Sequence, residues 1–312
     1  MWEGRDLHPL DANAPVVVGV DDSDQASDAL ALADVLGPLL GHPLVLAHVH
    51  PYGELQNLLE PGEYEQLVRD AAEATARRAA ELLHSATERR MQLVDARSAA
   101  RGLTTLAERG GAALIVIGAS RRSRLGRLLP GGTAERLLSG SPAPVAIAPS
   151  GYAAGDRRGV QAVGCAFDGS PESRRALDWA AAVARAAGAR LRVVGVYEPV
   201  PFAALVPPGG AMPSVAANDV LRGRQREELD AALSAIDDQL DATGALLNGD
   251  VPEVLTHEAR EVDLLVLGSR GYGPVRSVLL GSVSSAVVRS VECPVVVVPR
   301  TADPEASAAT GA

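Results

Sequence analysis

Asp263-Leu-Leu-Val-Leu-Gly268-Ser269-Arg270-Gly271 is the segment from which the fold can be worked out. The run Leu264–Leu267 is apolar at every position, which is typical of a strand covered on both faces. Such strands belong to the parallel sheets of α/β proteins. The segment therefore predicts a buried parallel strand that ends at Gly268.

Glycine and serine residues follow this strand at a spacing that suits an anion. Gly271 and Gly281 would let backbone N–H groups approach a phosphate closely. A helix over Val283–Ser290, with Ser282 as its N-cap, would add unpaired N–H groups and positive dipole charge. The alternative is a strand, a loop and a helix that only pack together. The carboxyl end of a strand is where open α/β sheets bind ligands, so the position favours the anion site.

The chain repeats itself once. The matching segments are Val16–Leu30 with Val163–Leu177, Ala113–Gly131 with Asp263–Gly281, and Ala143–Pro149 with Cys293–Pro299. The offset between the copies is nearly constant, which indicates a duplication of a whole half of the chain.

Strands and helices alternate in both halves. Strands are expected near Pro15–Val20, Leu44–Val49, Met91–Ala96, Ala113–Gly118 and Pro144–Ala148, and near Gln161–Phe167, Arg190–Tyr197, Ala245–Asn248, Asp263–Gly268 and Pro294–Val298. Helices of the first half are expected over Asp24–Leu40, Gly62–Arg90, Ser98–Arg109 and Thr133–Ser139. Helix-linked strands form parallel sheets with right-handed crossovers, so the fold class is α/β, with two tandem doubly wound domains.

Length and composition set the domain number and exclude several classes of protein. With 312 residues the chain is long enough for two domains, 1–150 and 151–312, the second with a disordered tail from about residue 301. The net charge of −10 argues against nucleic-acid binding, and the absence of lysine excludes a P-loop lysine. No apolar run approaches the ~18 residues of a membrane span and no secretory signal is evident, so we expect a cytoplasmic protein without a membrane partner.

Cysteine and histidine residues do not form a metal or catalytic motif. Cys165 and Cys293 fit no metal-ligand or redox spacing and are expected to be buried thiols. His48 and His50 share one face of a strand and could bind a metal, but no third ligand is evident, so packing at the strand end is preferred. We predict no metal site and no catalytic residues.

Several motifs of the second half resemble the universal stress protein family. They are Gly268-x2-Gly271-x9-Gly281-Ser282, the segment Cys293–Val298, and Val163–Leu177 with its Asp168-Gly-Ser turn. The resemblance covers nearly the whole half. It implies Rossmann-like domains, each with a five-stranded parallel sheet in the order 3-2-1-4-5.

The resemblance to ATP-binding members of that family implies a nucleotide site in the second half. Carried over by position, Ala166, Asp168 and Val196 would line the adenosine side, Leu267, Gly268, Arg270 and Gly271 would surround the ribose, and Gly281, Ser282, Val283 and Ser284 would hold the phosphates. On chemistry alone, Asp168 could equally cap the helix that begins at Pro171. ATP, alone or with Mg²⁺, is the expected ligand.

The first half departs from this pattern. The corresponding candidates are Asp21, Val49, Gly118, Arg121, Gly131, Gly132 and Thr133. Arg121 stands where the second glycine is expected, and glycine stands where the serine is expected. The arginines of this loop could supply charge to a phosphate or form a solvated basic face, and Thr133 could supply the missing hydroxyl. Nucleotide binding by the first half is left open.

The resemblance also implies how the chain acts. We expect a nucleotide-dependent stress-response regulator that works through binding, with little or no catalysis and an unidentified regulatory protein partner. A slow ATP hydrolase or nucleotidyl transferase and a ligand-free interaction scaffold remain as alternatives. Val145–Ala148 and Val295–Val298 would be sheet edges, and we expect them to pair inside the chain, which leaves room for a homodimer.

Overall fold

The structure is a computed structural model that describes residues 14–51, 61–119, 132–155, 159–199, 215–269 and 281–299. The elements of the first half are β1 (Val16–Val20), α1 (Asp24–Leu40), β2 (Leu44–Pro51), α2 (Pro61–Leu82), β3 (Arg89–Ala96), α3 (Ala99–Gly110), β4 (Leu114–Gly118), α4 (Thr133–Gly140) and β5 (Val145–Ala148). Those of the second half are β6 (Ala162–Ala166), α5 (Pro171–Ala187), β7 (Arg190–Tyr197), α7 (Val215–Ser234), β8 (Ala242–Asn248), α8 (Val251–Glu258), β9 (Leu264–Gly268), α9 (Ser282–Ser290) and β10 (Val295–Val298). Two 3₁₀ helices, η1 (Tyr152–Ala154) and η2 (Ala259–Glu261), complete the described elements.

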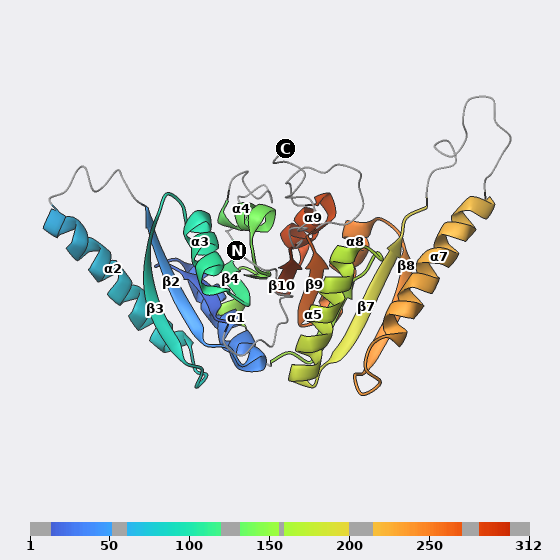
Figure 1. Cartoon of the computed structure of the whole chain (residues 1–312), viewed down its shortest axis with the longest axis horizontal. Helices are drawn as coiled ribbons and strands as arrows, with labels where there is room; N and C mark the ends of the chain where they lie inside the picture. Colours follow the sequence, from blue (N-terminus) through green and yellow to red (C-terminus); the bar gives the residue numbers. More distant parts are fainter. Residues whose placement is uncertain are drawn as a thin grey trace, which may run out of the picture.

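All these strands form one sheet in the order β3-β2-β1-β4-β5-β10-β9-β6-β7-β8. Counted within its own half, each set of five strands has the order 3-2-1-4-5 that the resemblance implies. Neighbours are parallel everywhere except at the centre, where β5 and β10 are antiparallel. In Figure 1 the two halves form two arms that meet at this central pair.

The central pair joins the halves, as expected from the sequence. Val295 lies opposite Ile147, and Val297 lies opposite Val145. Every residue of β5 and β10 is buried. The prediction that these strands pair with each other inside the chain is therefore confirmed.

Two apolar layers cover the sheet, and both cross from one half to the other. One lies under α1, α2, α5 and α7 and includes Leu30, Cys165 and Leu177. The other lies under α3, α4, α8 and α9 and includes Leu103, Leu137 and Leu255. The two halves therefore share a continuous core on each face of the sheet.

The two halves begin and end their first helices alike. Ser23 caps α1 by accepting a hydrogen bond from the Ala26 N–H at 3.2 Å. Ser170 caps α5 in the same way, with the Ser173 N–H at 3.1 Å. Both helices end at a glycine in the left-handed region, where a residue without a Cβ is favoured. These shared caps are the structural counterpart of the repeated sequence.

The helix expected over Gly62–Arg90 was predicted too long. It ends at Leu82, and Arg89 and Arg90 belong to β3, where they lie opposite Leu44 and Val45. The Asp34 carboxylate accepts the N–H groups of His84 at 3.0 Å and Ser85 at 2.8 Å, which holds the turn between helix and strand. Pairing with β2 thus overrides a local pattern that contains no helix breaker.

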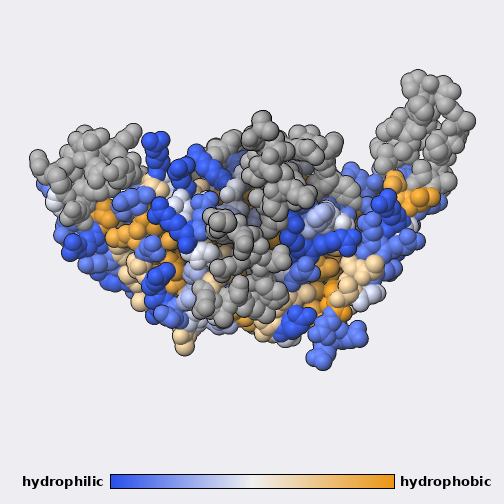
Figure 2. Space-filling view, in the orientation of Figure 1, coloured by the Kyte–Doolittle hydropathy of each residue, from blue (hydrophilic) through white to orange (hydrophobic). Residues whose placement is uncertain are grey.

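Most of the face seen in Figure 2 is hydrophilic, with small hydrophobic patches on the two outer flanks. The large apolar residues that the described part of the chain exposes are Leu67, Leu93, Val220 and Leu221, on α2, β3 and α7. Within the described residues, no helix combines the length and the apolar character needed to cross a bilayer. The predicted tail from residue 301 lies outside the described residues.

Candidate functional site

The order of the strands reverses between β6 and β9, and a crevice lies there at the carboxyl end of the sheet. It encloses a cavity of about 50 Å³. The lining residues come from β6, β7, β9, α5, α8, α9 and the turn after β6: Ala166, Phe167, Asp168, Ser173, Val194, Val196, Val251, Leu255, Leu267, Gly268, Val283 and Ser284.

Many of the site residues predicted from the sequence meet in this crevice. Those that line it are Ala166, Asp168, Val196, Leu267, Gly268, Val283 and Ser284. Gly281 and Ser282 lie next to it at the start of α9 but do not line it. Arg270 and Gly271 lie outside the described residues.

The sequence prediction missed part of the apolar wall of the crevice, namely Phe167, Val194, Val251 and Leu255. Val194 lies two residues before Val196 on β7, so both side chains point to the same face of the sheet. Val251 and Leu255 are four residues apart on α8 and share one side of that helix. The period of each element would have identified these residues once the position of the crevice was known.

Asp168 supports the start of α5 without being its cap. Its Oδ1 accepts the Ser170 N–H at 3.0 Å, while the Ser170 side chain is the N-cap of the helix. Ser173 is buried; it donates to the Ser170 carbonyl at 3.0 Å, and its Oγ accepts the Asp168 N–H at 3.3 Å. The capping role considered for Asp168 therefore belongs to Ser170, and one oxygen of Asp168 has no partner among the described residues.

Gly268 has a packing role that the spacing of the motif did not indicate. A Cβ at this position would lie 3.0 Å from the backbone carbonyl carbon of Glu172 in the first turn of α5. At the equivalent Gly118, it would lie 2.0 Å from the carbonyl oxygen of Gln25. These glycines allow the first helix of each half to approach the end of a neighbouring strand, whether or not a ligand is present.

The start of α9 differs from its prediction. Gly281, not Ser282, is the N-cap residue, and no side chain caps the helix. Ser284 is buried and donates from its Oγ to the Gly268 carbonyl at 3.0 Å, which ties α9 to the end of β9. The Ser282 hydroxyl is not used as a cap, because the helix begins one residue earlier than expected. Val283 and Ser284 of this first turn line the crevice.

The first half has an equivalent crevice between β1 and β4, and it is larger, about 280 Å³. Asp21, Val49, Gly118 and Thr133 line it. Gly132 is the N-cap residue of α4, so no side chain caps this helix. Arg121 and Gly131 lie outside the described residues. Departure from the loop pattern has therefore not removed the crevice.

Neither crevice is lined by a histidine or cysteine of the described residues. His48 Nδ1 lies 3.3 Å from Thr75 Oγ1, and His50 Nδ1 lies 3.0 Å from Asp95 Oδ1. In the described ranges, no group of three or more His, Cys, Asp or Glu side chains is arranged to hold a metal. Both thiols are free, and burial raises the pKa of Cys165 and, to about 12, that of Cys293.

Known proteins share both the motifs and the fold. The model of the universal stress protein family matches residues 13–149 and again 159–299. A universal stress protein of Mycobacterium tuberculosis is 36% identical over 155 residues, and the match covers 44% of this chain and 47% of that relative, so the chain spans about half of its length. A universal stress protein of Mycolicibacterium smegmatis is 28% identical over 311 residues, 91% of this chain and 96% of the relative.

A solved structure supports the same fold. The structure of a universal stress protein from Archaeoglobus fulgidus is 19% identical, with a TM-score of 0.60 over 95% of this chain and 98% of that chain. At this identity the likeness concerns the fold alone.

Proposed function

Since the chain belongs to the universal stress protein family, we propose that the crevice of its second half binds an adenine nucleotide, ATP, and that the chain acts through this binding. One observation carries the proposal. Residues from six helices and strands and from the turn after β6, far apart in the sequence, meet at the point where the strand order reverses. Ligands of open α/β sheets bind at that point.

The crevice chemistry suits the parts of a nucleotide. Val194, Val196 and Leu255 are apolar and would contact the flat base. The second oxygen of Asp168 would accept a hydrogen bond from a ribose hydroxyl. The first turn of α9, with Ser282 as its first residue, would offer N–H groups and positive dipole charge to the phosphates.

The size of the cavity limits what it encloses. Pockets that enclose a whole small-molecule ligand usually measure roughly 300–1,000 Å³. The cavity of the second half measures about 50 Å³. The enclosed space therefore suits a part of the base. The ribose and the phosphates would lie along the open carboxyl edge of β6 and β9.

Binding without turnover is the better fit to the side chains of the crevice. Among its described lining residues, Asp168 is the sole titratable group. General acid–base catalysis requires a group that can exchange a proton with the reacting atoms. One carboxylate already engaged by the Ser170 N–H is a weak basis for catalysis. Mg²⁺, if present, would have to arrive with the phosphates of the nucleotide.

Titration calorimetry with ATP on matched variants tests the proposal. Ser282→Glu places a negative charge where the phosphates would lie, and it also suits the helix dipole, so the fold should be retained. Ser282→Gln has a similar size without the charge. We expect ATP affinity to fall about tenfold or more for the Glu variant and to change little for the Gln variant. Equal affinities in both variants would contradict the proposed position of the phosphates.

A turnover measurement separates binding from catalysis. The protein is incubated with ATP and Mg²⁺, and ADP and AMP are measured. Release of product at about 1 s⁻¹, within the usual range of enzymes, would replace the regulator by an ATP-cleaving enzyme. No heat on titration and no co-purified nucleotide would favour a ligand-free scaffold.

The larger crevice of the first half makes it a second candidate for the same ligand. Its volume of about 280 Å³ is closer to that of known ligand sites. Thr133 is the first residue of α4, as Ser282 is of α9. Comparison of Thr133→Glu with Thr133→Gln, beside the Ser282 pair, assigns the measured heat to one half or to both.

A further inference from the structure

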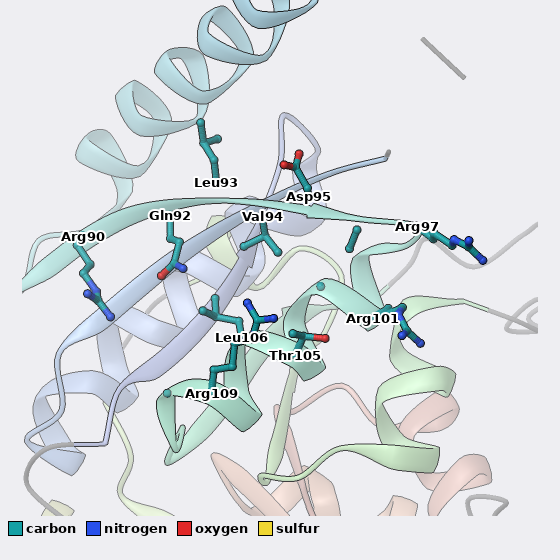
Figure 3. A pocket seen from close by; sticks show the side chains of 13 residues that line it. Arg90, Gln92, Leu93, Val94, Asp95, Arg97, Arg101, Thr105, Leu106 and Arg109 are labelled. Carbon is teal, nitrogen blue, oxygen red and sulfur yellow. The ribbon is translucent and has the colours of Figure 1, made fainter. Parts of the chain in front are cut away.

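A groove runs along the outer edge of the first half, between β3 and α3, on the face of the sheet that α3 covers (Figure 3). Its volume is about 920 Å³. Four exposed arginines line it: Arg90, Arg97, Arg101 and Arg109. Figure 3 shows Arg90 and Arg109 towards one end of the groove and Arg97 and Arg101 towards the other.

The positive charge of this groove is not neutralised by the described part of the chain. Within that part, none of the four arginines has an ion-pair partner. Asp95 is the one carboxylate of β3 and also lines the groove; its Oδ1 lies 3.0 Å from His50 Nδ1. In Figure 3 its side chain points to the opposite side of the strand from Val94. The groove therefore presents its positive charge to solvent.

The duplicated half shows that the fold does not need these arginines. The strand registers place Thr243 of β8 where Arg90 stands in β3. The N-caps Ser98 and Asp250 align α3 with α8, which places Glu253 at the position of Arg101. Glu261 corresponds in the same alignment to Arg109. The same architecture thus carries a basic groove on one outer edge and acidic side chains on the other.

The strand that forms one wall of the groove is also an edge of the sheet. β3 pairs with β2 and, in the described sheet, with no other strand. Half of its backbone N–H and C=O groups therefore point outwards without a ladder partner. Between the two arginine pairs the groove is partly apolar, with Val94 and Leu106. An edge strand beside a groove of this kind matches the way in which sheets bind extended peptides.

We propose that β3 and the arginine groove dock an extended acidic segment of a partner protein by strand addition. The added strand would pair with the free edge of β3. Every second side chain of that strand would then fall on the α3 face, so that carboxylates near its two ends meet Arg90 with Arg109 and Arg97 with Arg101. A small apolar side chain between them would lie on Val94 and Leu106. This interaction is independent of the nucleotide crevice.

A nucleic acid is a poorer fit to the same groove. Single strands are held by aromatic side chains that stack on the bases, and none occurs among the described lining residues. An alternative role of the arginines is protection of the edge strand, since charged side chains on edge strands keep other strands away. A peptide-binding experiment distinguishes an acidic segment, a nucleic acid and this protective role.

The probe is a labelled peptide of about nine residues, long enough to follow β3 at roughly 3.3 Å per residue. Its sequence is Glu-Thr-Glu-Thr-Val-Thr-Glu-Thr-Glu, with carboxylates at alternate positions. A control peptide has the same composition in blocks, Glu-Glu-Glu-Glu-Val-Thr-Thr-Thr-Thr. Binding to the full chain is followed by fluorescence anisotropy at two salt concentrations. Hydrogen exchange of the β3 amides is measured with and without peptide.

Two double variants with the same change in net charge are compared. Arg101→Glu with Arg109→Glu cancels the positive charge of the four groove arginines, because two positive charges then face two negative ones. Arg222→Glu with Arg260→Glu reverses two exposed arginines of the second half. We expect the alternating peptide to bind roughly tenfold more weakly to the first and unchanged to the second. It should also slow exchange of β3 amides in the unmodified chain. If the Arg101→Glu, Arg109→Glu variant unfolds, the milder Arg101→Gln, Arg109→Gln variant replaces it in the comparison.

Several results would overturn the proposal. Failure of the alternating peptide to bind would favour the protective role of the arginines. Equal binding of the block peptide, or equal loss in both double variants, would show attraction to net charge without strand addition. Displacement of the peptide by an equally charged single-stranded oligonucleotide, without protection of β3 amides, would make nucleic acid the ligand.

Discussion

The buried carboxylate of Asp28 on α1 accepts a hydrogen bond from the backbone N–H of Gly151, at 2.9 Å, in the segment that leads from the first half to the second. Its other oxygen accepts the Ala153 N–H at 2.8 Å. One side chain therefore fixes the path of the chain directly after β5. With the N-caps Ser23 and Ser170 aligned, Arg175 stands in α5 where Asp28 stands in α1, so the link is specific to the first half.

Asp28→Asn is expected to destabilise the protein by about 1–3 kcal/mol. The two N–H groups bind two different oxygens of Asp28, and an asparagine side chain replaces one of these oxygens by an NH₂ group. One backbone N–H would then face another donor in a buried site. The measurement is urea-induced unfolding followed by circular dichroism. Asp34→Asn is the matched control. Asp34 also accepts two backbone N–H groups, but it is only partly buried, so its loss should cost less. A larger loss for Asp34 would contradict the role given to Asp28.

Gly118→Ala is expected to be more destabilising than Gly268→Ala. The added methyl group would lie 2.0 Å from the Gln25 carbonyl oxygen in the first case and 3.0 Å from the Glu172 carbonyl carbon in the second. Backbone atoms cannot move away as a side chain can, so we expect losses of about 3 and about 1 kcal/mol. Thermal and urea unfolding of the two single variants measure the difference. Equal stability of both variants would show that these helices shift easily.

His48 is expected to make the protein less stable in mild acid. Burial lowers the pKa of its imidazole below the usual 6.5, and the neighbouring His50 lowers it further. The unfolded chain therefore binds a proton more readily than the folded chain once the pH falls below about 6.5, so stability is lost as the pH decreases through that value. Urea midpoints between pH 7.5 and pH 5, values chosen to bracket that pKa, should fall less for His48→Gln than for the unmodified chain. Parallel curves would contradict this origin of the pH dependence.

Neither thiol is expected to react in the folded protein near pH 8. Cys165 is fully buried, and burial raises the pKa of both cysteines, that of Cys293 to about 12. Since the thiolate is the reactive form, labelling by a maleimide or an aromatic disulfide should be slow until the chain is unfolded. The measurement is the rate of labelling with and without urea. Fast labelling of Cys293 in the native protein would indicate local opening near the start of β10.

Local patterns in the sequence predicted much of the fold correctly. The bounds of α1 and β7 agree with the structure, because Ser23 and Gly41 cap α1 and Gly188, the C-cap of α5, comes directly before the apolar run of β7. The end of α2 was wrong, since nothing between Leu83 and Arg90 signals that the chain turns to pair with β2. Helix ends marked by a cap can be predicted from the sequence, whereas ends set by a distant strand cannot.

The candidate site shows the same division. Asp168, Gly268 and Ser284 were carried over by position from the family resemblance, and the structure places them at one crevice. Leu255 and Ser173 were missed because they gain a role only through their neighbours in space. Ser284 was assigned to the phosphates, and in the structure its hydroxyl donates to the Gly268 carbonyl at 3.0 Å.

The sequence by itself determined the duplication and the α/β class, because repeats, apolar runs and turn residues are properties of short segments. The pairing of β5 with β10 was expected from the family resemblance. Only the tertiary structure decided that Asp28 holds the segment at Gly151, that Gly118 is needed for helix packing, and that four arginines face one groove beside β3. Each of these depends on which residues meet after folding. The free energy of such contacts comes from burial and hydrogen bonding between segments distant in the chain, so no local pattern contains it.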